Sequence, residues 1–138
     1  MFEFAMALPL LTMLLVGIIF GGIIFFNYID LADAVEAGAR TLATSRQQGT
    51  SACSQATTAV KSSNGNLTSS LITVAPMSFG QSTCSATLVQ GDNATVSATY
   101  PCNLQIPFTS FNFCPVQGNG STCPTSYCIS ATTTVYIE

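Results

Sequence analysis

The sequence contains no histidine and no tryptophan, and charge is scarce, with three basic and six acidic side chains among 138 residues. Without histidine, the side chain that most often serves as general acid or base is absent. No P-loop and no glycine-rich dinucleotide motif is present. We therefore expect that this chain is not an enzyme and that it has no catalytic, cofactor-binding or metal site.

Basic residues are too few and too scattered to bind a phosphate backbone. The net charge is −3, and no block of three basic residues occurs anywhere in the chain. Binding to nucleic acid needs several lysine or arginine side chains close together. The composition therefore argues against a nucleic-acid partner.

Charge is missing altogether from residues 4–29, which are mostly apolar. About 20 apolar residues are enough for a helix that crosses a bilayer. A cleavable signal peptide is the alternative interpretation, but its apolar core is usually about 7–15 residues long and follows a basic stretch. We expect a membrane-spanning helix that is retained in the chain.

Four residues inside this apolar segment weaken a helix, namely Pro9, Gly17, Gly21 and Gly22. One interpretation is close packing of neighbouring helices through small residues. The other is a kink or a place where the helix loosens when it leaves the membrane. The sequence leaves both interpretations open.

The helical pattern continues beyond the apolar segment but becomes amphipathic. Leu31, Val35 and Leu42 recur at helical spacing. Glu36 and Arg40 lie four residues apart on the polar side, in the order that favours an ion pair on the helix surface. We expect one helix over residues 1–48, about 70 Å long at 1.5 Å per residue. A rod of that length exceeds a compact domain of this size and implies a membrane plus a partner, or many partners.

Residues 49–138 are rich in serine and threonine and have the pattern of a small β-rich head. We expect a short helix near 51–63, a strand in SSLITVAP, a hairpin formed by SATLVQ and ATVSATYP, and a last strand in YCISATTTVYIE. A long cysteine-containing loop over 102–128 separates the last two strands. The predicted fold class is α+β, with a long N-terminal hydrophobic helix and a small antiparallel β-sheet head.

The even number of cysteines predicts disulfides, because all six follow the apolar segment. An export-type segment followed by an even set of cysteines is typical of an oxidising compartment. Six cysteines allow 15 pairings, and the sequence does not choose among them. The expected disulfide cysteines are Cys53, Cys84, Cys102, Cys114, Cys123 and Cys128.

Three motifs in the first third of the chain, EFAMALPLL, GIIFGGIIF and EAGAR, resemble those of TadE-like pilins and pseudopilins of tight-adherence secretion systems. The resemblance implies a pilin-like fold and a structural subunit of an extracellular type IV-like filament. It further implies a homo-oligomer assembled through the N-terminal helix, anchoring in the inner membrane before assembly, contact with a pilus assembly machinery, and a role in adhesion.

Glu3 is the one charge at the start of the apolar segment. In type IV-like filaments such a glutamate is thought to meet the free N-terminal amine of a neighbouring subunit, so the resemblance implies this role for Glu3. The alternatives are a solvated position at the membrane interface or a favourable interaction with the positive start of the helix. The alternative function for the whole chain is a single-span membrane-anchored extracellular binding module that uses the loop from Cys102 to Cys128.

Overall fold

The computed structural model describes residues 2–45, 50–79, 82–83, 91–104, 112, 114 and 127–137. Side chains at positions 2, 3, 5, 50, 51, 79, 82 and 83 lie outside this description.

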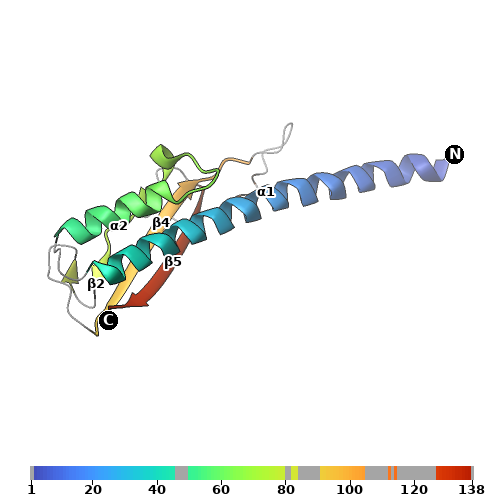
Figure 1. The fold of residues 1–138 in the computed structure, drawn as a ribbon. Helices are drawn as coiled ribbons and strands as arrows, with labels where there is room; N and C mark the ends of the chain where they lie inside the picture. The colour runs from blue at the N-terminus through green and yellow to red at the C-terminus, as the bar shows by residue number, and fades with distance from the viewer. Residues whose placement is uncertain are drawn as a thin grey trace.

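Helix α1 (Phe2–Thr44) dominates the molecule and projects far beyond the head (Figure 1). Its 43 residues correspond to about 65 Å. Helical structure continues through Pro9, where the Thr12 hydroxyl donates to the Pro9 carbonyl oxygen at 2.9 Å. At the other end the Thr44 and Ser45 hydroxyls donate back to the carbonyl oxygens of Arg40 and Thr41. These local bonds compete with further helix formation, which is consistent with the end of α1 at this point.

Helix α2 (Thr50–Ser62) packs against the second half of α1 and runs in the opposite direction. The two helices approach each other closely at Gly38. A Cβ atom built on Gly38 would collide with the Val60 side chain and would lie 3.2 Å from the Ala56 carbonyl oxygen. Only a residue without a side chain permits this approach, so Gly38 sets the spacing of the two helices.

The sheet is antiparallel and is centred on β4 (Asn93–Pro101), which pairs along its full length with β5 (Cys128–Tyr136). The other edge of β4 pairs with β1 (Thr73–Val74) and with β2 (Ser78–Phe79), and β3 (Ser82–Thr83) pairs with β2. A one-turn 3-10 helix, η1 (Ser69–Leu71), precedes β1. Gly91 adopts a φ of 91° in the turn before β4, a conformation that disfavours residues with a side chain.

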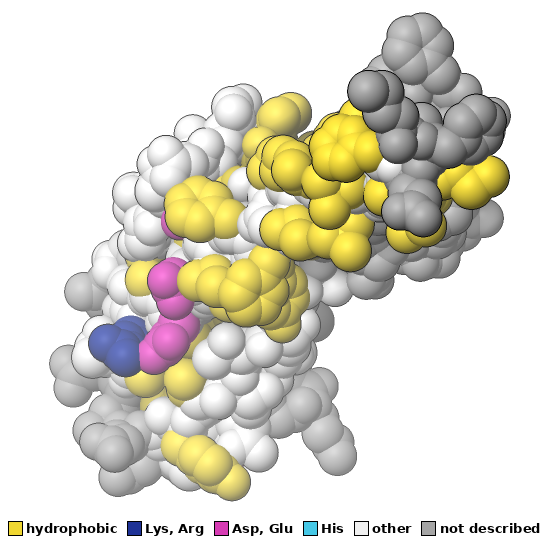
Figure 2. Space-filling model, turned by 90° about the vertical axis from the view of Figure 1, so that its right-hand side faces the viewer, with side chains coloured by type: hydrophobic (Ala, Val, Ile, Leu, Met, Phe, Trp, Pro, Cys, Tyr) yellow, Lys and Arg dark blue, Asp and Glu magenta, His cyan; other side chains and the backbone are white. Residues whose placement is uncertain are grey.

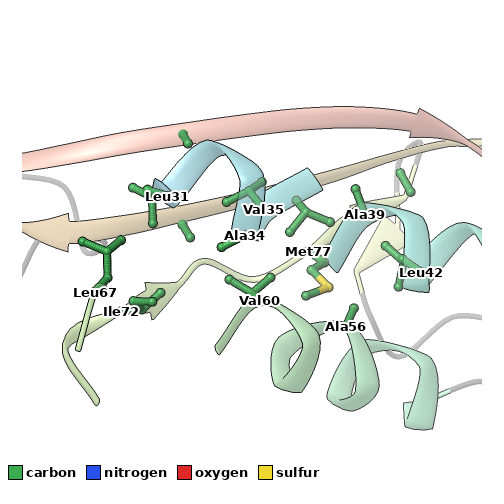
Figure 3. Close-up of a cluster of buried hydrophobic side chains, with 14 of the residues drawn as sticks. Leu31, Ala34, Val35, Ala39, Leu42, Ala56, Val60, Leu67, Ile72 and Met77 are labelled. Carbon is green, nitrogen blue, oxygen red and sulfur yellow. The ribbon is translucent and has the colours of Figure 1, made fainter. Parts of the chain in front are cut away.

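The core lies between the sheet and the two helices (Figure 3). One side of α1 packs on β4 and β5, and another packs on α2. Alternate residues of β4 face this core, and Leu67, Ile72 and Met77 fill it from the connection between α2 and β2. The fully buried members with the largest side chains are Leu31, Val35, Leu42, Val60, Val96, Cys128 and Ile137.

This architecture confirms the predicted fold class, a long apolar helix with a small antiparallel sheet. One element differs from the prediction: the sequence predicts a strand in SSLITVAP, but its first part forms η1 and only Thr73–Val74 joins the sheet. The backbone N–H groups of Leu71 and Ile72 donate to the carbonyl oxygens of Thr68 and Ser69, so they bond within this turn and not to β4. The SATLVQ half of the expected hairpin and most of the expected loop over 102–128 lie outside the described residues.

Disulfides stabilise the head, as the cysteine count predicts. Cys102 and Cys114, which lie 12 positions apart in the sequence, form one bond next to the end of β4. Cys53 on α2 and Cys128 at the start of β5 are disulfide-bonded as well. Cys84 and Cys123 lie outside the described residues. Such bonds stabilise a folded chain mainly by restricting its unfolded state, which suits a head with so few large apolar residues.

The close approach at Gly38 leads to a stability prediction. In the full chain in detergent, Gly38→Ala lowers the free energy of unfolding by roughly 1–2 kcal/mol, because overpacking outweighs the gain in helix propensity. Val60→Ala in the same chain removes the colliding methyl groups and makes the loss less than additive. Thermal unfolding followed by circular dichroism measures both effects.

Gly22→Ala is the matched control, because a Cβ atom on Gly22 meets nothing within 4 Å. It adds a methyl group to the same helix and leaves the head unaffected. Equal melting temperatures for the Gly38→Ala and Gly22→Ala chains would contradict the assigned role of Gly38.

Candidate functional site

The projecting half of α1 carries apolar side chains. Among the described ones, none is buried against another part of the chain. Met13, Leu14, Leu15 and Val16 are all exposed, although four consecutive residues point to every side of a helix. The surface is therefore apolar all round rather than on one face. Its exposed large side chains are Phe4, Met6, Leu8, Leu10, Leu11, Met13, Leu14, Leu15, Val16, Ile18, Ile19, Ile23, Phe25, Phe26, Tyr28 and Ile29.

We call this segment, Phe4–Ile29, the apolar rod. Figure 2 shows its hydrophobic side chains gathered over the projecting helix. Helix α1 is long and apolar enough to cross a membrane, and its most apolar stretch is not buried inside the chain. A helix that is hydrophobic all round is a buried helix, in the interior of a larger structure or in a membrane. The single chain supplies no such surroundings for the apolar rod.

The apolar rod ends abruptly at Asp30. Ile29 is 43% exposed whereas Leu31 is completely buried in the head. Between them, the Asp30 carboxylate accepts hydrogen bonds from the backbone N–H groups of Gly65 at 3.0 Å and Asn66 at 2.7 Å. These two bonds attach the turn after α2 to the place where α1 leaves the head. Asp30 therefore defines the neck of the molecule.

The solvent side of α1 beyond the neck is polar. Arg40 donates to Glu36 at 2.5 Å, and the two side chains remain 75% and 50% exposed. Such an exposed pair contributes about 0.3–0.5 kcal/mol. With Asp33 and Ala37 it lines a shallow depression on the surface. In Figure 2 the charged side chains of this side lie together on the head, next to the apolar rod.

The residues predicted to act in the N-terminal part of α1 are distributed along the helix and do not converge on one site. Glu3 lies within the backbone span of α1, but its side chain is outside the described residues, so its pairing stays a prediction. A Cβ atom on Gly17, Gly21 or Gly22 would meet nothing within 4 Å. Contacts inside the described chain thus do not require glycine at these three positions. The proposed loosening at these positions and at Pro9 also stays a prediction.

Two structural residues were not recognised from the sequence. The sequence does not reveal the contact of Asp30 with the turn after α2, nor the role of Gly38 at the contact with α2. The clue to Asp30 is the Asn64-Gly65-Asn66 stretch, a turn sequence whose N–H groups need acceptors. Its distance along the chain from Asp30 conceals the connection.

The described residues do not bring together three histidine, cysteine, aspartate or glutamate side chains that could hold a metal ion. The arrangement of the described residues offers surfaces rather than a chemical centre: the apolar rod, the polar side of α1, and the solvent face of the sheet.

Comparison with known proteins gives one match. Residues 1–40 match the family model described as TadE-like protein. No curated protein and no solved structure matches the chain. The matched residues comprise the apolar rod, the neck and the helix as far as Arg40. This confirms the resemblance noted in the N-terminal motifs. With the apolar helix, it fits a membrane-anchored component associated with a pilus system.

The contacts of Asp30 predict how the neck responds to mutation. Asp30→Ala leaves two backbone N–H groups without their acceptor and lowers the free energy of unfolding by about 1–3 kcal/mol. Asp30→Asn keeps one acceptor oxygen and costs less. Amide hydrogen exchange measured by NMR shows the local effect, with faster exchange at Gly65 and Asn66.

Asp33→Ala is the control, because Asp33 is an exposed residue on the same helix less than one turn away. It removes the same charge without touching the turn. Unchanged exchange at Gly65 and Asn66 in the Asp30→Ala chain would contradict the assigned contact.

Proposed function

We propose that this chain, whose first 40 residues match the TadE-like family, is a structural subunit of an extracellular Tad-type filament. In this proposal the apolar rod forms the filament core by packing against the rods of other copies. The head faces water and contributes to adhesion or surface attachment.

The apolar rod is the observation that carries this proposal. Full burial of one leucine, isoleucine or phenylalanine side chain contributes about 1.5–3 kcal/mol, and such residues are exposed on every side of the apolar rod. Lipid satisfies this surface while the chain is anchored in the inner membrane. After extraction from the membrane only other apolar surfaces replace the lipid, and identical rods of sister subunits are the available ones.

The head supports the same proposal because its fully buried core lies outside the apolar rod, although Ile24 of the rod packs against that core while partly exposed. Among the described residues, every buried hydrophobic side chain belongs to Leu31 or to a residue after it, so the rod contributes none of them. Asp30 holds the head together at the neck. The rod can therefore exchange lipid for protein neighbours without unfolding the head, as a subunit that is transferred by an assembly machinery must.

The alternative function is a single-span membrane-anchored extracellular binding module. A helix long enough to cross a membrane is equally compatible with it. The two proposals differ in whether the rod ever leaves the lipid.

Electron microscopy of material sheared from cells separates these proposals. We expect regular fibres that contain this chain, detected by an antibody against the head, and depletion of the chain from the membrane fraction. The control is a chain with Ile18→Asp, which places a charge in the apolar rod and should abolish fibres. Finding the wild-type chain only in membranes, as a monomer, would contradict the filament and favour the binding module.

Glu3 provides a separate test of how subunits pair. No basic residue occurs in residues 4–29, so the available cation in a filament core is an N-terminal amine, and we expect the amine of a neighbouring copy to pair with Glu3. Glu3→Gln leaves that amine unpaired, at a cost of several kcal/mol, and should reduce the yield of fibres at least about tenfold. The chain should still insert into the membrane.

Asp33→Asn serves as the matched control, because it neutralises an exposed carboxylate outside the apolar rod. Normal fibres from Glu3→Gln would remove the pairing and leave the filament proposal intact.

A further inference from the structure

The sheet has two faces of different chemistry. Along β4, Ala94, Val96 and Ala98 are buried toward the helices, and the residues between them point to the opposite side. The register places Asn93 opposite Tyr136, Thr95 opposite Thr134, and Ser97 opposite Thr132. We call this set the Tyr136 face. Its members are Asn93, Thr95, Ser97, Thr132, Thr134 and Tyr136.

The Tyr136 face carries no charge at any of these positions. It presents hydroxyl groups, one amide and one aromatic ring. The Thr95 and Thr134 hydroxyl oxygens lie 3.2 Å apart and form a hydrogen bond across the two strands. A hydroxyl group has one donor and two acceptor positions, so each of these residues keeps capacity for another partner.

Tyr136 is the most exposed aromatic side chain of the described head. It is 70% exposed, and the only other large hydrophobic residue of the described head that is exposed is Leu71, at 47%. A tyrosine ring in this position offers a flat apolar surface with a polar tip. It has only two side-chain torsions to restrict, so binding to it costs little conformational entropy.

The Tyr136 face lies far from the apolar rod. Strand β5 ends at Tyr136, near the end of the molecule opposite the N-terminus (Figure 1). Both helices lie on the other side of the sheet. Neither a membrane around the rod nor a core of packed rods would reach this end of the head.

We propose that the Tyr136 face binds a neutral polysaccharide. The ring of Tyr136 stacks on the C–H face of a sugar ring, and Asn93 and the threonine hydroxyls bond to the sugar hydroxyls. Antibody paratopes likewise combine rigid aromatic surfaces with adaptable hydroxyl and amide groups. The inference rests on the proposed function for the adhesive role of the head, but the binding itself needs only one chain.

Charge decides the class of ligand. A ligand with phosphate, sulfate or carboxylate groups requires basic side chains, which the Tyr136 face lacks. The net charge of −3 repels polyanions further. A neutral glycan needs no charged partner and matches an uncharged face that consists of hydroxyl groups, an amide and a ring. Binding at one head is weak because the ligand is not enclosed, and repetition of the head along a filament strengthens it by avidity.

The test is a glycan array that carries neutral and anionic glycans, probed with the full chain. The chain is kept monomeric in an alkylphosphocholine detergent, because the head groups of sugar-based detergents would compete. We expect binding to neutral glycans that is unchanged between 0.15 and 1 M NaCl, where charge interactions are screened. Monomers in detergent report on the face alone, so the result is independent of whether the chain forms fibres.

Three variants connect binding to the face. Tyr136→Thr removes the ring but keeps a residue that favours strands, and we expect binding to fall at least about tenfold. Tyr136→Phe keeps the ring and should bind nearly as wild type. Leu71→Ala, the matched control, removes the other exposed apolar side chain of the described head and should leave binding unchanged. Circular dichroism verifies that each variant is folded.

Three results would overturn the proposal. The first is no binding of the wild-type chain to any neutral glycan. The second is binding only to anionic glycans, with release in 1 M NaCl. The third is an equal affinity of the folded Tyr136→Thr and Leu71→Ala chains for the same neutral glycan.

Discussion

Helix α1 is buried in two incompatible ways along its length, and this constraint shapes the rest of the protein. From Leu31 to Leu42 one side is buried by the sheet and α2, while polar residues occupy the other. From Phe4 to Ile29 apolar side chains are exposed on every side and none is fully buried, although Ile24 packs partly against the core. The N-terminal half needs partners from outside the chain, whereas the C-terminal half is covered by the chain's own sheet and α2. The head has to fold on one part of a helix without covering the other.

The neck separates these two regimes within a single turn of helix. The Asp30 carboxylate bonds to two backbone N–H groups of a turn, where an apolar residue could not satisfy them. On the same helix, α1, Gly38 lets α2 come close enough to cover the side of α1 that faces the core. The disulfide between Cys102 and Cys114 and the bonds made by Cys53 and Cys128 constrain the head further. In the described residues no buried side-chain polar atom lacks a hydrogen-bond partner.

The sheet also separates two roles. Its inner face contributes small residues such as Ala94, Ala98 and Ala131, which let α1 lie close to the strands. Its outer face is free of charge at the positions of β4 and β5, which is why we assign an uncharged ligand to it. The proposed assembly surface on the rod and the proposed ligand surface on the sheet thus lie at opposite ends of the molecule (Figure 1).

Features that depend on neighbouring residues in the chain could be predicted from the sequence. The apolar rod follows from the absence of charge in residues 4–29, the amphipathic continuation from the spacing of Leu31, Val35 and Leu42, and β5 from alternation in its own residues. The disulfides follow from the number and position of the cysteines. The sequence predicts a strand where η1 forms, because the conformation of so short an element depends on where the chain meets β4.

The sequence by itself determined that one helix is apolar all round and then amphipathic, since periodicity is a local property. Tertiary structure alone decided which residues meet across the fold: Asp30 with Gly65 and Asn66, more than 30 positions away, Gly38 with Val60, and Tyr136 with Asn93. Such contacts depend on how α1, α2 and the strands pack together, and no local pattern records the distance between elements that are remote in the chain.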